Sequence, residues 1–310
     1  MKKLFILSVL AFLIFSATKA ENKVKRISDV IYDHRDGVAL VMDVLVPEKQ
    51  NGIAVFKMVS GGWVSFNAAY ISEKDVREFT DKGETVFLVS HGAKPRYKVP
   101  EIIDQIQRAI RYVRYNAKTF GVDPNRFGIT GGSSGGHLSV SAGVFGKDAI
   151  SEADYRKEHS LKPTDVVDPV NLVSSKVQAV ACYFPPVNLV SYNHPDSTFA
   201  DFKNVAVFVD AFGITKDTPR EKAKEIFRQS SPYFFVSPTT PPMLIFQGTK
   251  DLLVPYSQAV NFIAKLKENN IPCQLITKEG AGHGWPYKKS DDEAMINWFE
   301  KYLPTSAGEK

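Results

Sequence analysis

The chain has 310 residues, of which 44% are hydrophobic and 24% charged, and its formal net charge is +5. A chain of this length buries a large core, and with only two cysteines it is no disulfide-stapled scaffold; length alone permits one domain or two. The slight excess of basic residues gives no indication of a nucleic-acid partner.

The N-terminus has the pattern of a Sec-type signal peptide, residues 1–20. Two lysines precede an apolar run over residues 4–15, and mostly small residues follow up to Ala20. The run is shorter than the roughly 20 residues that cross a bilayer, and no second long apolar run follows. A retained N-terminal anchor is the alternative. We therefore expect a periplasmic or secreted protein without stable membrane insertion, in which residues 21–310 form a single domain.

A hairpin opens the expected domain. Residues 27–32 and 38–46 alternate between apolar and polar side chains, and Asp36-Gly37 lies between them. This dipeptide is typical of a tight turn between antiparallel strands.

Short apolar runs then alternate with helical patterns, as in a mostly parallel sheet whose strands are buried on both faces. This predicts a doubly wound α/β fold behind the hairpin. The expected strands are residues 53–59, 84–90, 126–130, 177–184, 243–246 and 273–277, and the expected helices are residues 102–113, stopped by Gly121, then 256–266 and 295–303.

Two stretches interrupt this alternation, residues 146–175 and 188–242. We expect cap-like insertions at the carboxyl ends of the strands, where ligands bind in such sheets. The alternative is surface loops without a ligand role. The cysteines, Cys182 and Cys273, lie in strand-like runs, which favours buried free thiols over a disulfide.

The segment 131–137, Gly-Gly-Ser-Ser-Gly-Gly-His, lies between a predicted strand and an apolar helix pattern. A nucleophilic serine on a sharp strand-to-helix turn needs glycines on both sides. The spacing fits either Ser133 or Ser134 and cannot choose between them. A phosphate-binding turn is the alternative, but no lysine follows as a P-loop requires.

Two later loops supply the partners that activate a serine. Asp251 follows the strand at 243–246, and His283 stands in a glycine-rich loop after the strand at 273–277. The order Ser, Asp, His along the chain is that expected for a base and its orienting acid in this fold. Asp201 and Asp210 are the fallback acids, and His137 lies close enough to the turn to line the site.

Donors for an oxyanion are expected after the strand at 53–59, which runs into Ser60-Gly61-Gly62-Trp63. The backbone N–H groups of Gly61 or Gly62, with that of Ser134, would form the hole. An ordinary Gly-Gly turn is the alternative. Trp63 and Trp285 are candidates for the substrate pocket, where they would stack on a sugar ring or an aromatic acyl group.

These motifs together resemble the hormone-sensitive-lipase-like branch of the α/β-hydrolase esterases and lipases, including bacterial feruloyl- and acetylxylan-esterase-like members. The matching stretches are residues 59–63, 131–137, 248–255 and 280–284, and the resemblance covers most of residues 27–305. It places Ser133 on the family's nucleophile and Ser134 on its alanine. Where the family has His-Gly-Gly-Gly, this chain has Val59-Ser60-Gly61-Gly62. The histidine and the first glycine are replaced, so the resemblance does not fix the position of this oxyanion loop or the substrate range.

The resemblance implies hydrolysis of carboxylic esters through an acyl-enzyme, with no cofactor or metal. The implied substrate is a small-molecule or carbohydrate ester, such as an acetyl or feruloyl ester of a polysaccharide. Two other functions stay open: a serine exopeptidase of the prolyl-oligopeptidase type, and a non-catalytic binding protein on the same fold. Nothing in the sequence indicates an oligomeric state.

Overall fold

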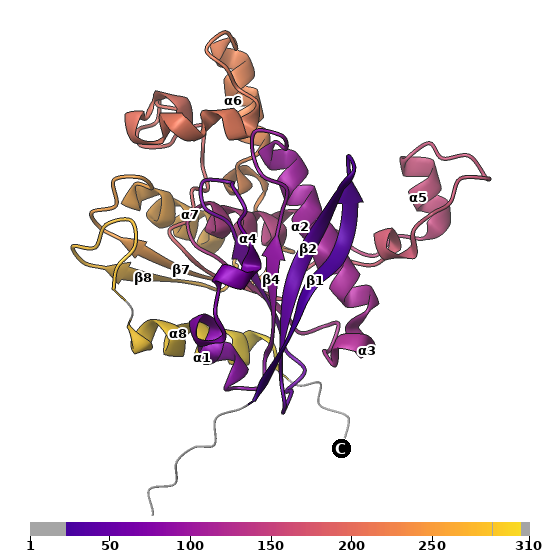
Figure 1. Ribbon diagram of the computed structural model, residues 1–310. Coiled ribbons are helices and arrows are strands. Elements are labelled where there is room, and N and C mark those ends of the chain that lie inside the picture. Colours follow the sequence, from indigo (N-terminus) through magenta and orange to yellow (C-terminus); the bar gives the residue numbers. More distant parts are fainter. Residues whose placement is uncertain (1–22, 287, 305–310) are drawn as a thin grey trace, which may run out of the picture.

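The computed structural model describes residues 23–286 and 288–304, so the predicted signal peptide lies outside the described residues (Figure 1). The described residues form an eight-stranded central sheet with the order β1-β2-β4-β3-β5-β6-β7-β8. β1 pairs antiparallel with β2 and β2 with β4, and all other neighbours are parallel. The strands are β1 Val24–Arg35, β2 Val38–Pro47, β3 Ala54–Val59, β4 Thr85–Ser90, β5 Phe127–Thr130, β6 Ala179–Tyr183, β7 Met243–Gly248 and β8 Cys273–Lys278.

The predicted hairpin is confirmed. Arg35 pairs with Val38 across the turn, and the two residues between them, Asp36 and Gly37, have φ values of 50° and 75°. Positive φ at both central positions defines a type I′ turn, whose twist matches that of the two strands.

Helices cover both faces of the sheet. One face carries α2, α4 and α7, and the other carries α1 and α8. The helices are α1 Arg77–Thr80, α2 Val99–Tyr115, α3 Ala117–Phe120, α4 Ser134–Phe145, α5 Glu152–Glu158, α6 Arg220–Gln229, α7 Tyr256–Glu268 and α8 Lys289–Tyr302.

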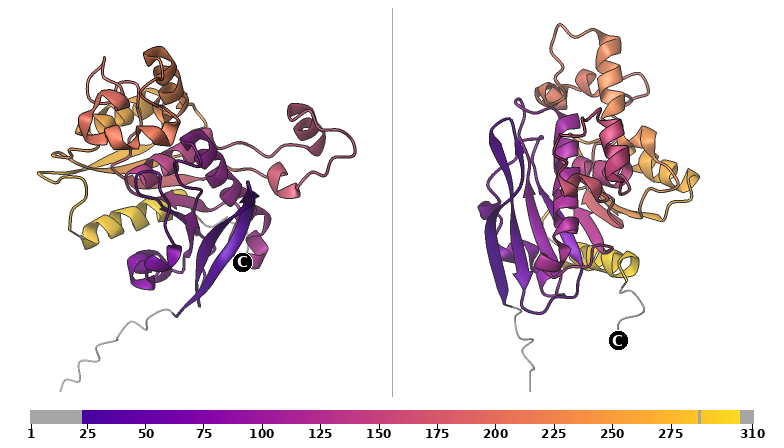
Figure 2. Two further views of the ribbon diagram at one scale, coloured as in Figure 1. Left: turned by 45° about the horizontal axis from the view of Figure 1, so that its top comes forward. Right: turned by 90° about the vertical axis from the view of Figure 1, so that its right-hand side faces the viewer.

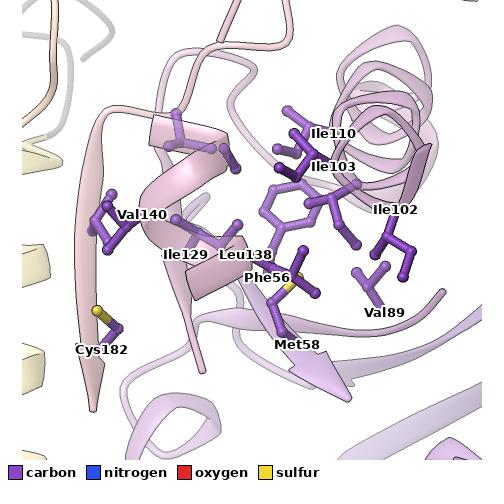
Figure 3. Packing of buried hydrophobic residues seen from close by; sticks show 14 of the residues in the cluster. Phe56, Met58, Val89, Ile102, Ile103, Ile110, Ile129, Leu138, Val140 and Cys182 are labelled. Carbon is purple, nitrogen blue, oxygen red and sulfur yellow. The ribbon is translucent and has the colours of Figure 1, made fainter. Parts of the chain in front are cut away.

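Side chains of the central strands alternate between these two layers. In β3, Phe56 and Met58 enter the core beneath α2 and α4, whereas Val55 and Val59 enter the core beneath α1 and α8. Figure 3 shows the first core, in which isoleucines of α2 pack against side chains of β3 and α4. Burial on both faces explains the continuous apolar runs and confirms the doubly wound α/β prediction.

The first crossover helix extends beyond the expected range of residues 102–113 at both ends, because α2 begins at Val99. α2 ends at Tyr115, and the separate short helix α3 reaches to Gly121, whose φ of 67° ends it in the left-handed region. Glycine adopts this conformation without steric cost, so the stop at Gly121 is where the sequence places it.

The segment 188–242 lies above the carboxyl ends of the strands and includes α6 (Figures 1 and 2). It is fixed to the loops that follow three different strands. The Tyr192 hydroxyl donates to the Leu253 carbonyl at 2.7 Å, Lys94 pairs with Asp210 at 2.6 Å, and Phe208 packs against Trp63. We use "cap" for residues 188–242 below.

The segment 146–175 differs from the expectation that it covers the same edge. It carries α5 and projects beside α2 (Figure 1). Arg108 of α2 pairs with Asp168, and the Arg111 side chain donates to the Val173 carbonyl at 3.2 Å. Basic side chains of α2 therefore fix this segment along the helix, which sequence periodicity does not reveal.

Both cysteines are free thiols, Cys182 buried and Cys273 partly exposed. They lie on β6 and β8 with β7 between them, and strands about 4.8 Å apart leave them too distant for a disulfide. Within residues 23–286 and 288–304, no helix is long and apolar enough to cross a membrane.

Candidate active site

The turn after β5 has the backbone strain expected of a nucleophile elbow. Ser133 has φ 56° and ψ −120°, and its N–H donates to the Tyr183 carbonyl at 3.1 Å. A Cβ on Gly131 would lie 2.6 Å from the Gly135 carbonyl carbon, and one on Gly136 would lie 2.6 Å from the Tyr183 oxygen. The glycines are therefore required because the turn touches backbone on two sides.

A continuous hydrogen-bond chain joins the three predicted residues. The Ser133 Oγ lies 2.9 Å from His283 Nε2, and His283 Nδ1 lies 2.8 Å from Asp251 Oδ2. Since an ionised carboxylate only accepts, Nδ1 carries the proton and Nε2 accepts from the Ser133 hydroxyl. This is the arrangement in which an imidazole can remove a serine proton.

The structure distinguishes the two serines that the spacing left open. Ser134 is 1% exposed, and its Oγ lies 3.0 Å from Ser60 Oγ instead of facing the histidine. Ser133 alone of the two contacts His283. The choice rests on the direction of each side chain from the turn, which sequence spacing does not contain.

The carboxylate of Asp251 is fully buried and held from several directions. Its Oδ1 accepts from the backbone N–H groups of Leu253 and Val254 at 2.8 and 2.9 Å, and Gln247 Nε2 donates to Oδ2 at 3.1 Å. Sequence reasoning missed Gln247, although a polar residue at the end of an apolar strand was a visible signal. These donors fix the carboxylate in the orientation that His283 needs.

The two fallback acids lie elsewhere. Asp201 pairs with Arg220 at 2.8 Å and caps the 3₁₀ helix at 199–201, while Asp210 pairs with Lys94 at 2.6 Å. Both carboxylates belong to residues 188–242 and are held in ion pairs, and neither contacts His283.

The loop after β3 forms a type I′ turn from Gly61 to Val64. Gly62 and Trp63 both have φ 58°, and the backbones of Gly61 and Val64 exchange two hydrogen bonds of 3.0 Å. The Gly61 N–H is therefore engaged within the turn, so of the two expected glycine donors Gly62 stays the candidate. Ser134 begins α4, so its N–H belongs to the first turn, where no intrahelical acceptor exists.

Trp63 is a core residue, which corrects its assignment to the substrate pocket. It is 2% exposed and packs on the cap residues Phe199 and Phe212, with ring centroids 5.8 and 5.0 Å away. Its indole N–H donates to His137 Nδ1 at 3.3 Å, while the Nε2–H of His137 donates to the Ser230 carbonyl at 2.8 Å. Trp63 thus fastens the cap to the predicted oxyanion loop.

His137 does not line the site, because it is fully buried. Burial lowers the pKa of its imidazole to about 4, so the ring stays neutral and has one lone pair to accept the Trp63 proton.

Trp285 lies beside the site. It is half-buried and contacts the rings of Tyr183 and Phe184, and the Phe184 ring lies 4.5 Å from that of His283. Tyr183 and Phe184 were not predicted, although they end the apolar strand next to the elbow strand. Over the same described ranges, no group of three or more His, Cys, Asp or Glu side chains is placed to hold a metal ion.

Ser133 follows β5, Asp251 follows β7 and His283 follows β8, so parallel strands deliver all three to one edge of the sheet. Proteins built in this way are the α/β hydrolases. The sequence matches the family BD-FAE over residues 42–266, and the chain belongs to that family.

The chain is also similar to individual proteins, to LipC in sequence and to two solved structures in fold. Esterase LipC of Mycobacterium tuberculosis is 25% identical over 256 residues, covering 81% of this chain but only 58% of LipC. The solved truncated form of a carbohydrate esterase from gut microbiota has a TM-score of 0.74 at 26% identity, covering 92% of this chain and 98% of the other. An acetyl ester-xyloside bifunctional hydrolase from Caldicellulosiruptor lactoaceticus has a TM-score of 0.68 at 22% identity, covering 88% and 96%.

Proposed function

We propose that this chain is a serine hydrolase that cleaves carboxylic esters through an acyl-enzyme. The observation that carries the proposal is the unbroken chain of contacts from Ser133 through His283 to the fully buried Asp251. As Ser133 Oγ attacks the ester carbonyl carbon, its proton passes to His283 Nε2. The backbone N–H groups of Gly62 and Ser134 stabilise the oxyanion that forms.

The second half of the reaction reuses the same groups. The imidazolium gives its proton to the departing alcohol oxygen, which leaves Ser133 acylated. Water then attacks the acyl carbon while His283 takes the water proton, and the acid departs as the Ser133 hydroxyl is restored. Asp251 orients the ring and stabilises its charged form in both halves.

Family membership supports an esterase, as do the relatives LipC, named an esterase, and the gut carbohydrate esterase at 26% identity over nearly the whole of both chains. The latter likeness favours a carbohydrate ester, acetyl or feruloyl, as the substrate. The N-terminal pattern of residues 1–20 favours export, so we place this activity in the periplasm or outside the cell.

The experiment that tests the proposal compares the two adjacent serines. Ser133→Ala is expected to lower kcat for p-nitrophenyl acetate by about 10⁴-fold or more and to abolish labelling by a fluorophosphonate probe. Ser134→Ala keeps Ser133, and we expect kcat within about tenfold of the wild type, since it removes a hydroxyl contact but no reacting group. The reverse result would overturn the assignment of Ser133.

Two further outcomes address the other functions. Hydrolysis of aminoacyl nitroanilides at a higher kcat/KM than esters would indicate the exopeptidase. A wild-type protein that neither hydrolyses esters nor takes up the probe would indicate a binding protein.

A further inference from the structure

A small cavity of about 180 Å³ adjoins the His283 loop. Its lining combines three aromatic side chains, Tyr183, Phe184 and Trp285, with three charged residues at or just before the start of α8, Lys288, Asp291 and Asp292. The space corresponds to roughly six water molecules at ~30 Å³ each, which is room for one ring-sized ligand group.

The aromatic side of this cavity is rigid. Trp285 Nε1 donates to Asp291 Oδ2 at 2.8 Å, and Asp291 also pairs with Lys278. The rings of Tyr183 and Phe184 meet the indole at 61° and 83°, so neither stacks flat on it. The half-buried Trp285 ring is therefore held in place without a parallel ring of the protein against it, and the Lys278 ammonium lies 5.9 Å from its centroid.

The polar groups of the cavity divide into two sets. Asp291 is 4% exposed and committed to Trp285 and Lys278. By contrast, the hydroxyl of Tyr183, the carboxylate of Asp292 and the ammonium of Lys288 have no hydrogen bond or ion pair with any described residue. A donor, an acceptor and a cation thus remain available beside an aromatic wall.

The position of the cavity relative to His283 indicates which part of a substrate binds in it. The ring centroid of Phe184 lies 4.5 Å from that of the His283 imidazole. The backbone of Phe184 has a φ of 37°, a left-handed value that bulky residues rarely adopt. Trp285 follows His283 by two residues. Since His283 Nε2 must protonate the departing alcohol oxygen, a cavity on the histidine side receives the alcohol and not the acyl group.

We infer that this cavity is a binding site for one pyranose ring of the alcohol portion of a carbohydrate ester. This rests on the proposed ester hydrolysis. Aromatic rings pack against the apolar C–H face of a sugar, while Tyr183, Asp292 and Lys288 hydrogen-bond to its hydroxyl groups. Such a site distinguishes a saccharide ester from an ester with a small alcohol, because only the first makes these contacts.

The test removes the free polar groups without touching the catalytic residues. Tyr183→Phe and Asp292→Asn are expected to raise KM for acetylated xylo-oligosaccharides by about 5–10-fold each, one lost hydrogen bond apiece. For Asp292→Asn, kcat/KM for p-nitrophenyl acetate is expected to stay within about twofold. Glu293→Gln is the control, since this neighbour on α8 pairs with Lys289 and lies outside the cavity; it should change neither substrate.

Binding without turnover separates this inference from the proposed function. Xylobiose titrated into the Ser133→Ala protein should bind, and adding Tyr183→Phe and Asp292→Asn should weaken its affinity at least fivefold. Absence of xylobiose binding, an unchanged KM in both variants, or equal losses on both esters would overturn the sugar site. Failure of the wild type on every ester, with xylobiose binding intact, would overturn the esterase alone.

Discussion

The bond between Trp63 and His137 gives a prediction whose size follows from the structure. Trp63→Phe keeps an aromatic ring in the core but removes the indole N–H, so His137 Nδ1 loses its donor. His137 cannot turn to water, because it is fully buried, and its Nε2–H is committed to the Ser230 carbonyl. An unsatisfied buried acceptor costs about 1–3 kcal/mol, and the smaller ring adds about 1 kcal/mol of lost packing.

Trp298 is a matched control in the same protein. It is buried to a similar degree, at 6% exposure, yet its Nε1 has no hydrogen-bond partner among the described residues. Trp298→Phe should therefore cost only the packing part, and relief of the unpaired donor offsets some of that loss. We expect Trp63→Phe to lower the free energy of unfolding by about 1–3 kcal/mol more than Trp298→Phe does.

Urea unfolding, followed by circular dichroism, measures the free energy of unfolding of both variants. The two values can be compared if the variants unfold with equal m-values. Esterase activity gives a second reading, because Trp63 adjoins Gly62 of the proposed oxyanion hole and holds the cap, whereas Trp298 lies on α8. We expect a lower kcat for p-nitrophenyl acetate only in Trp63→Phe. Equal destabilisation by the two substitutions would refute the assigned role of the Trp63–His137 bond.

Three other predictions concern burial, backbone space and thiols. Desolvation raises the pKa of buried Glu84 to about 8, which is above its pKa in the unfolded chain. The contribution of Glu84 to the free energy of unfolding is therefore full in acid and is lost as the pH rises toward 8. Glu84→Gln should raise the melting temperature relative to the wild type at pH 8.5, but not at pH 4. Gly131→Ala, whose Cβ would meet backbone at 2.6 Å, should prevent soluble expression or abolish activity. Gly132→Ala should stay folded, because its Cβ would come no closer than 3.3 Å to another atom, in the Phe184 ring. In a thiol assay without denaturant, the partly exposed Cys273 should react well before the buried Cys182. Adding a reductant should leave the melting temperature unchanged. A change of the melting temperature with reductant would indicate a disulfide.

Local chemistry is strong enough to predict much of this protein from its sequence. Asp36-Gly37 specifies its turn because few other residues accept positive φ twice in succession. The buried strands are visible as apolar runs because both faces of the sheet are covered. The glycines around Ser133 mark the elbow for a similar reason, since a Cβ at Gly131 would overlap the backbone of the next turn.

Where the prediction failed or stayed open, distant segments share a space that no spacing rule describes. Ser133 and Ser134 satisfy the same motif, and only the fold shows that one faces His283 while the other meets Ser60. Trp63 resembles a pocket residue in the sequence, but the cap, more than 130 residues later in the chain, covers it. Burial depends on what packs from the other side, and that is decided when the chain folds.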